Sequence, residues 1–115
     1  MKLKWLLAFV LFIPLTTQAQ YKYGLTPVTL EKYVSNKKTN PQNELINLEK
    51  HIPGVKLDIR YATTNNFTKE KIYNLSRAYA RKPVAESLKK AQEEFNKLGY
   101  GIKIFDAYRP YAATV

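Results

Sequence analysis

Cysteine is absent from this chain of 115 residues, and histidine occurs only once. Without cysteine there is no disulfide framework, no thiolate nucleophile and no thiolate metal ligand. A catalytic zinc site usually takes three protein ligands, so the lone His51 cannot form one by itself. Because His51 stands beside Pro53-Gly54, a turn signal, we expect it to have a surface or structural role. A Ser-His-Asp triad and a glycine-rich phosphate loop have no support either.

A hydrophobic run long enough to cross a membrane is also missing. The longest apolar stretch, Trp5 to Leu15, falls well short of the ~20 residues that a membrane-spanning helix needs. Lys2 and Lys4 precede it and the small residue Ala19 follows a short polar segment, which is the order of a secretory signal peptide. We therefore predict a signal peptide over residues 1–20, cleavage after Ala19, and export to the periplasm or the exterior. An uncleaved N-terminal anchor is the alternative.

Acidic residues are scarce, with 9 against 19 lysines and arginines. Loss of Lys2 and Lys4 with the signal leaves 17 basic residues against 9 acidic ones, a net charge of +8. A basic surface suits anionic wall polymer, anionic lipid or nucleic acid, and export makes nucleic acid the least suitable of these. The alternative is an ordinary solvated surface, since the basic residues form no dense run.

Two expected strands and one helix organise the rest of the chain. Residues 21–43 are a polar leader by composition, with a short helical turn near Thr29 to Val34, and a linker over Asn43 to Lys50 leads into a small domain over 44–115. Apolar and charged residues alternate from Val55 to Tyr61, which predicts a strand with one buried face. The same alternation predicts a second strand from Tyr100 to Asp106.

The helix is expected from Pro83 to Leu98. Proline is favoured at the first helical position, and apolar residues recur every three or four positions from Val84 onward on one face. Gly99 is the expected C-terminal stop.

The most promising chemical segment is Asp106-Ala107-Tyr108-Arg109-Pro110, at the end of the second strand. Catalytic residues are frequent on loops that follow a rigid strand or helix. An arginine there offers a planar, permanently charged fork to a carboxylate or an oxyanion. From the spacing alone, the alternative interpretation is an arginine that is paired with Asp106 or solvated.

Three segments in order resemble the D-alanyl-D-alanine dipeptidases, the VanX-like zinc D,D-dipeptidases. They are Leu57 to Thr63 with Asn65-Asn66-Phe67-Thr68, then Arg77 to Leu98, then Ile104 to Pro110, whose D-A-Y-R-P is a family motif. The resemblance covers about residues 44–115 and corresponds to the N-terminal portion of the family's domain.

The resemblance implies an α+β fold, with a small antiparallel sheet flanked by helices that is incomplete in this chain. It also implies hydrolysis of the D-Ala-D-Ala dipeptide, or a related peptidoglycan fragment, by a zinc-activated water. Arg109 would stabilise the transition state, with Asp106 and Tyr108 supporting its loop.

The family's zinc ligands and its glutamate base lie C-terminal to D-A-Y-R-P, and no residue here matches them. The resemblance therefore implies that the metal ligands lie beyond Val115, in a longer protein or gene of which this chain is a part. Asp58 and His51 receive no metal role, and the chain alone is predicted to be inactive. The alternative function is a non-enzymatic, exported basic module that binds cell-wall polymer.

Overall fold

The architecture is built from two short pairs of strands and one long helix. The computed structural model describes residues 26–114, so the expected signal peptide lies outside the described residues. Strand β1 (Leu45–Asn47) pairs antiparallel with β3 (Tyr79–Arg81), in the register Ile46 opposite Ala80. Strand β2 (Lys56–Leu57) pairs in parallel with β4 (Lys103–Ile104). The expected α+β class with a small antiparallel sheet and flanking helices is confirmed.

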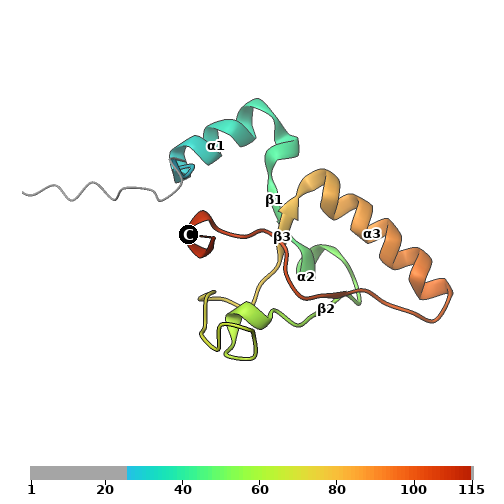
Figure 1. Ribbon diagram of the computed structural model, residues 1–115. Helices are drawn as coiled ribbons and strands as arrows, with labels where there is room; N and C mark the ends of the chain where they lie inside the picture. Colours follow the sequence, from blue (N-terminus) through green and yellow to red (C-terminus); the bar gives the residue numbers. More distant parts are fainter. Residues whose placement is uncertain (1–25, 115) are drawn as a thin grey trace, which may run out of the picture.

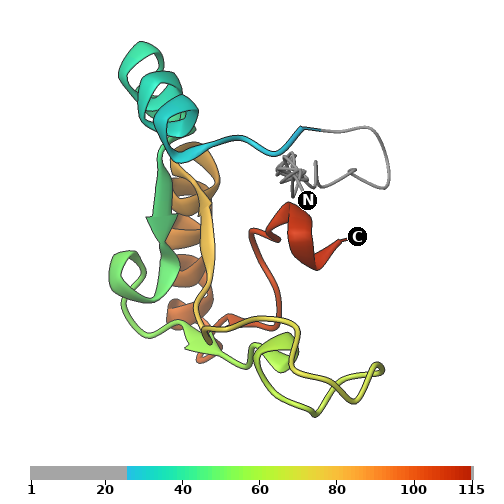
Figure 2. The same cartoon turned by 90° about the vertical axis from the view of Figure 1, so that its left-hand side faces the viewer.

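Helix α3 (Lys82–Lys97) agrees with the expected helix to within one residue at each end. Pro83 stands in its first turn, and Gly99 follows its C-terminus with a φ of +79°, a left-handed conformation that glycine adopts without strain. The helix runs beside the β1–β3 pair (Figure 2). In the described part of the chain, no helix is long and apolar enough to cross a membrane.

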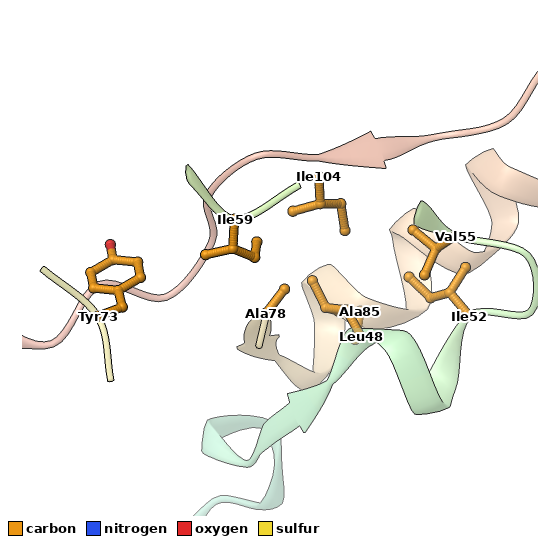
Figure 3. Packing of buried hydrophobic residues seen from close by; sticks show 8 residues of the cluster. All are labelled: Leu48, Ile52, Val55, Ile59, Tyr73, Ala78, Ala85 and Ile104. Atoms are coloured by element: carbon orange, nitrogen blue, oxygen red, sulfur yellow. The ribbon is translucent and has the colours of Figure 1, made fainter. Parts of the chain in front are cut away.

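The core collects side chains from α2, α3, β4 and the segments that connect them rather than from one sheet face. Figure 3 shows the aliphatic members gathered between α2, α3 and the β2–β4 pair, with Tyr73 at one end of the cluster. The buried hydrophobic residues are Leu48, Ile52, Val55, Ile59, Tyr73, Ala78, Ala85 and Ile104. A core this small places a large share of the stabilisation on a few hydrogen bonds between segments.

The linker expected over Asn43 to Lys50 was wrong. This segment forms β1 and then the short helix α2 (Leu48–His51), and Leu48 is fully buried. The strand pairing with β3 joins residues more than thirty positions apart, which no local pattern reveals. Before it, α1 (Leu30–Thr39) is longer than the single turn expected there, capped by the Thr29 side chain.

The strand expected over 55–61 is shorter than its alternation suggested. Val55 and Ile59 are buried, as the period-two pattern predicted, but only Lys56–Leu57 pairs with a neighbouring strand. The chain then tightens into a 3₁₀ turn, η2 (Arg60–Ala62), because β4 offers only two residues for pairing. The second expected strand, 100–106, is likewise confined to β4.

Candidate functional site

The D-A-Y-R-P segment follows strand β4 and lies at the end of the core. The backbone N–H of Asp58 donates to the Ile104 carbonyl at 2.8 Å, and that of Lys56 donates to the Ile102 carbonyl at 3.0 Å. The N–H of Ile102 in turn donates to Oε1 of the buried Gln92 on α3 at 2.7 Å. The strand is therefore fixed from two sides just before the motif begins.

The loop from η2 to Tyr73 lies on the other side of the site from β4, and one side chain, Asn66, closes it. Nδ2 of Asn66 lies within hydrogen-bond distance of the backbone carbonyls of Thr63 at 2.7 Å and Glu70 at 2.8 Å. Its Oδ1 accepts the N–H of Thr68 at 2.9 Å. The N–H of Tyr73 donates to the Tyr61 carbonyl at 2.8 Å, so the loop begins and ends at one point.

Asp106, Arg109 and Tyr73 meet between β4 and this loop. The Tyr73 hydroxyl donates to Oδ1 of Asp106 at 2.9 Å and accepts Nε–H of Arg109 at 3.2 Å. Nη2 of Arg109 donates to Oδ2 of Asp106, so that three hydrogen bonds join the three side chains in a closed ring. The guanidinium also stacks over the Tyr61 ring, 4.9 Å from its centroid, which adds a cation–π contact.

This ring of contacts fixes the charge states of its members. Burial opposes ionisation of Asp106, but hydrogen bonds from Arg109, Tyr73 and its neighbour's backbone N–H outweigh it and leave the pKa of Asp106 below its ordinary value. Burial, reinforced by the hydrogen bond to Asp106, raises the pKa of Tyr73. The pKa of Arg109 is raised by its hydrogen bond to Asp106 first and to Tyr73 second. At neutral pH the site therefore holds a carboxylate, a guanidinium and a neutral phenol.

Arg109 is held by one edge only. Its Nε and Nη2 bond to Tyr73 and Asp106, whereas no group within residues 26–114 bonds to Nη1. The side chain is 41% exposed and lines a pocket of about 200 Å³ together with Tyr61 and Phe67. A guanidinium fixed on one edge and open on the other can donate to an anionic or carbonyl oxygen that enters this pocket.

Tyr108 takes a different direction from its neighbours in the motif. Its backbone N–H donates to the Tyr79 carbonyl at 2.8 Å, which ties the motif to β3. Its side chain is 52% exposed and lines a larger, mainly apolar groove of about 650 Å³ beside α3. The structure thus joins Asp106 and Arg109 but leaves the Tyr108 side chain outside their contacts, and a supporting role for Tyr108 rests on its backbone.

The described residues do not fit a zinc site. No cluster of three histidine, cysteine, aspartate or glutamate side chains able to hold a metal occurs in the described part of the chain. Nε2 of His51 lies 3.2 Å from Oε1 of Glu86, between α2 and α3, and Asp58 lies 3.6 Å from Arg60 Nε. The expectation that the metal ligands lie beyond Val115 stays a prediction, because the described residues do not test it.

Sequence reasoning missed Tyr73 as a site residue. The sequence places it 33 positions before Asp106 and 36 before Arg109, and among nine tyrosines nothing marks it as more than a core aromatic. The usable signal was its position just after the N-N-F loop, where the loop returns to Tyr61.

Comparison with known proteins shows which family the chain belongs to. The sequence model of the D-ala-D-ala dipeptidase family matches residues 41–115, which include the Asn66 loop, α3 and the D-A-Y-R-P segment. The chain belongs to the D-ala-D-ala dipeptidase family. All three residues of the hydrogen-bonded ring lie inside the matched region.

Individual family members show the same extent of similarity. The chain is 38% identical over 75 residues to a D-alanyl-D-alanine dipeptidase of Enterococcus faecalis, covering 64% of this chain and 37% of that protein. The values are 40% over 69 residues for the Enterococcus faecium dipeptidase, covering 58% and 34%, and 31% over 70 residues for that of Escherichia coli, covering 61% and 36%. The chain spans about a third of the length of the curated relatives it matches.

Proposed function

We propose that this chain acts as the N-terminal portion of a D-alanyl-D-alanine dipeptidase in peptidoglycan metabolism, with Arg109 as its transition-state stabiliser. The observation that carries the proposal is the state of Arg109 within the family's D-A-Y-R-P motif. Its guanidinium is charged and is fixed along its Nε–Nη2 edge by Asp106 and Tyr73, and the residue lines a pocket.

The physical reason is electrostatic. When water adds to a scissile carbonyl, negative charge develops on the carbonyl oxygen. A donor already aimed at that oxygen needs no reorganisation in the transition state, and removing one such donor costs about 10²–10³ in kcat. Asp106 contributes by holding the guanidinium in place, since the carboxylate is itself ionised.

The substrate follows from the activity of the relatives, which are D-alanyl-D-alanine dipeptidases. A pocket of about 200 Å³ suits a small dipeptide better than a folded polypeptide. We propose the D-Ala-D-Ala dipeptide, or a related peptidoglycan fragment, as the molecule whose carbonyl oxygen meets Arg109.

A zinc ion that activates the attacking water is part of the proposal through the family resemblance alone. Residues 26–114 offer no ligand set for it, so its ligands would belong to other residues of the working enzyme. Arg109 can stabilise charge but cannot generate a hydroxide. We therefore expect the 115 residues alone to release no D-alanine from D-Ala-D-Ala.

Export to the periplasm or the exterior completes the proposal. Its support is the order of charged, apolar and small residues in 1–20, which matches a signal peptide.

The test is expression of the complete reading frame that contains these residues, followed by measurement of D-alanine release from D-Ala-D-Ala. Arg109→Ala should lower kcat by about 10²–10³, and Arg109→Lys should recover only part of it because a point charge replaces a planar fork. Lys90→Ala, an exposed position on α3, is the matched control and should leave the rate unchanged.

Two outcomes would contradict the proposal. Full activity of Arg109→Ala would remove the role given to Arg109. Absence of any turnover, combined with salt-sensitive binding to anionic wall polymer, would favour the non-enzymatic basic module instead.

A further inference from the structure

A buried tyrosine hydroxyl stands between the two charged groups of the site. Tyr73 is 8% exposed, and its Oη lies 2.9 Å from Asp106 Oδ1 and 3.2 Å from Arg109 Nε. A carboxylate only accepts hydrogen bonds and a guanidinium only donates them. The hydroxyl must therefore give its proton to Asp106 and turn a lone pair toward Arg109.

The hydrogen bond to Tyr73 fixes the plane of the Arg109 guanidinium. The Nη2–Asp106 bond alone would leave the guanidinium free to swing about that contact, because one hydrogen bond does not fix a plane. The second bond, from Nε to Tyr73, lies on the same edge and sets the plane of the group. The Tyr61 ring supports one face of that plane from 4.9 Å.

We infer that Tyr73 is a positioning residue for Arg109: the Tyr73 hydroxyl fixes the plane of the guanidinium and leaves Nη1 available to a ligand in the pocket that Arg109 lines. The catalytic meaning of this orientation rests on the proposed function, but the orientation itself is a property of the 115 residues. The D-A-Y-R-P motif supplies only the Asp106 contact; the second bond comes from Tyr73, which enters from the end of the Asn66 loop.

The ring of Tyr73 and its hydroxyl have separable tasks. The ring packs against Tyr61 with centroids 5.6 Å apart and joins the core, and phenylalanine can do the same. Tyr73→Phe therefore keeps the packing and removes only the hydrogen bonds. Tyr100→Phe is the matched control, because Tyr100 is 71% exposed and lies away from the site.

The first measurement is the Arg109 Nε–H signal in a side-chain ¹⁵N NMR spectrum of the full 115-residue chain. We expect a shifted, slowly exchanging signal in the parent and in Tyr100→Phe, and its loss in Tyr73→Phe. Asp106→Asn keeps the Tyr73 contact and should retain the signal. Persistence of the signal in Tyr73→Phe, or its loss only in Asp106→Asn, would overturn the inference.

The second measurement is a double-mutant cycle with inorganic phosphate as an oxyanion probe, followed through the Tyr61 ring resonances. Tyr73→Phe should weaken phosphate binding about threefold to tenfold, in line with one net hydrogen bond. In an Arg109→Lys background the same change should have no effect, because the group that Tyr73 orients is gone. Equal effects in both backgrounds would show that Tyr73 does not act through Arg109.

Neither measurement uses turnover, so the two proposals fail separately. Missing D-Ala-D-Ala hydrolysis by the complete reading frame would remove the proposed function and leave the Tyr73–Arg109 link standing. An unchanged Nε–H signal in Tyr73→Phe would remove the link and leave the dipeptidase assignment untouched.

Discussion

Replacing Gln92 by leucine should destabilise the chain and loosen the approach to the site. Gln92 is 2% exposed, and its Oε1 is the acceptor for the Ile102 N–H at 2.7 Å. Leucine is similar in size but leaves that N–H without a protein partner in a half-buried position. An unsatisfied buried donor costs about 1–3 kcal/mol. For a domain of this size, that corresponds to a fall in Tm of roughly 5–20 °C.

Thermal and urea unfolding followed by circular dichroism would measure this loss. Glu93→Ala is the matched control, since Glu93 is the exposed neighbour of Gln92 on α3 and lies at a helical position where alanine is well tolerated. It should change stability by less than about 0.5 kcal/mol. A Gln92→Leu variant as stable as the parent would refute the claim that this amide fixes the entry to β4.

Three further predictions concern other parts of the chain. Gly54→Ala should destabilise the chain more than Gly99→Ala in the same unfolding assay. Both glycines have a φ near +80°, but of the two only Gly54 would bring an added Cβ against Gln92 Nε2, at 3.3 Å. Equal losses of stability in the two variants would contradict this. Folding lowers the pKa of Asp106, so the ionised carboxylate stabilises the fold above its ordinary pKa of about 3.9, and this stabilisation is lost as the pH falls through the folded value. Asp106→Asn should therefore make the free energy of unfolding less dependent on pH in the acid range. The same acid dependence in parent and variant would argue against this. Mass spectrometry of the exported protein should find an N-terminus near Gln20, whereas recovery of an intact Met1 end would disprove signal cleavage.

The long helix could be predicted because its evidence is local. Apolar spacing, Pro83 and Gly99 all lie within the helix or at its ends, and the observed bounds agree with them. The alternation around Val55 and Ile59 also identified the buried side chains correctly. It could not reveal how many residues find a strand partner, because that depends on β4, more than forty positions away.

In the site too, the contact between residues close in sequence was predictable and the contact between distant residues was not. Asp106 and Arg109 are three residues apart, so the motif itself predicted that they could pair. Tyr73 reaches them only because the loop closed by Asn66 brings the chain back to Tyr61. Such a return depends on tertiary contacts, so the part of the site that orients the arginine was not predictable from the pattern of residues.

The hydrogen-bonded ring also has a consequence for the order of folding. Its members come from segments 33 and 36 positions apart, and the β2–β4 pair beneath it joins Lys56 to Lys103. Contacts this distant in sequence must overcome the entropy of closing a long loop, and they form slowly compared with a helix. An emerging or unfolded chain therefore carries Arg109 as an ordinary solvated cation. The oriented arginine exists only once these long-range contacts have formed, which makes its Nε–H signal a probe of tertiary folding around the site.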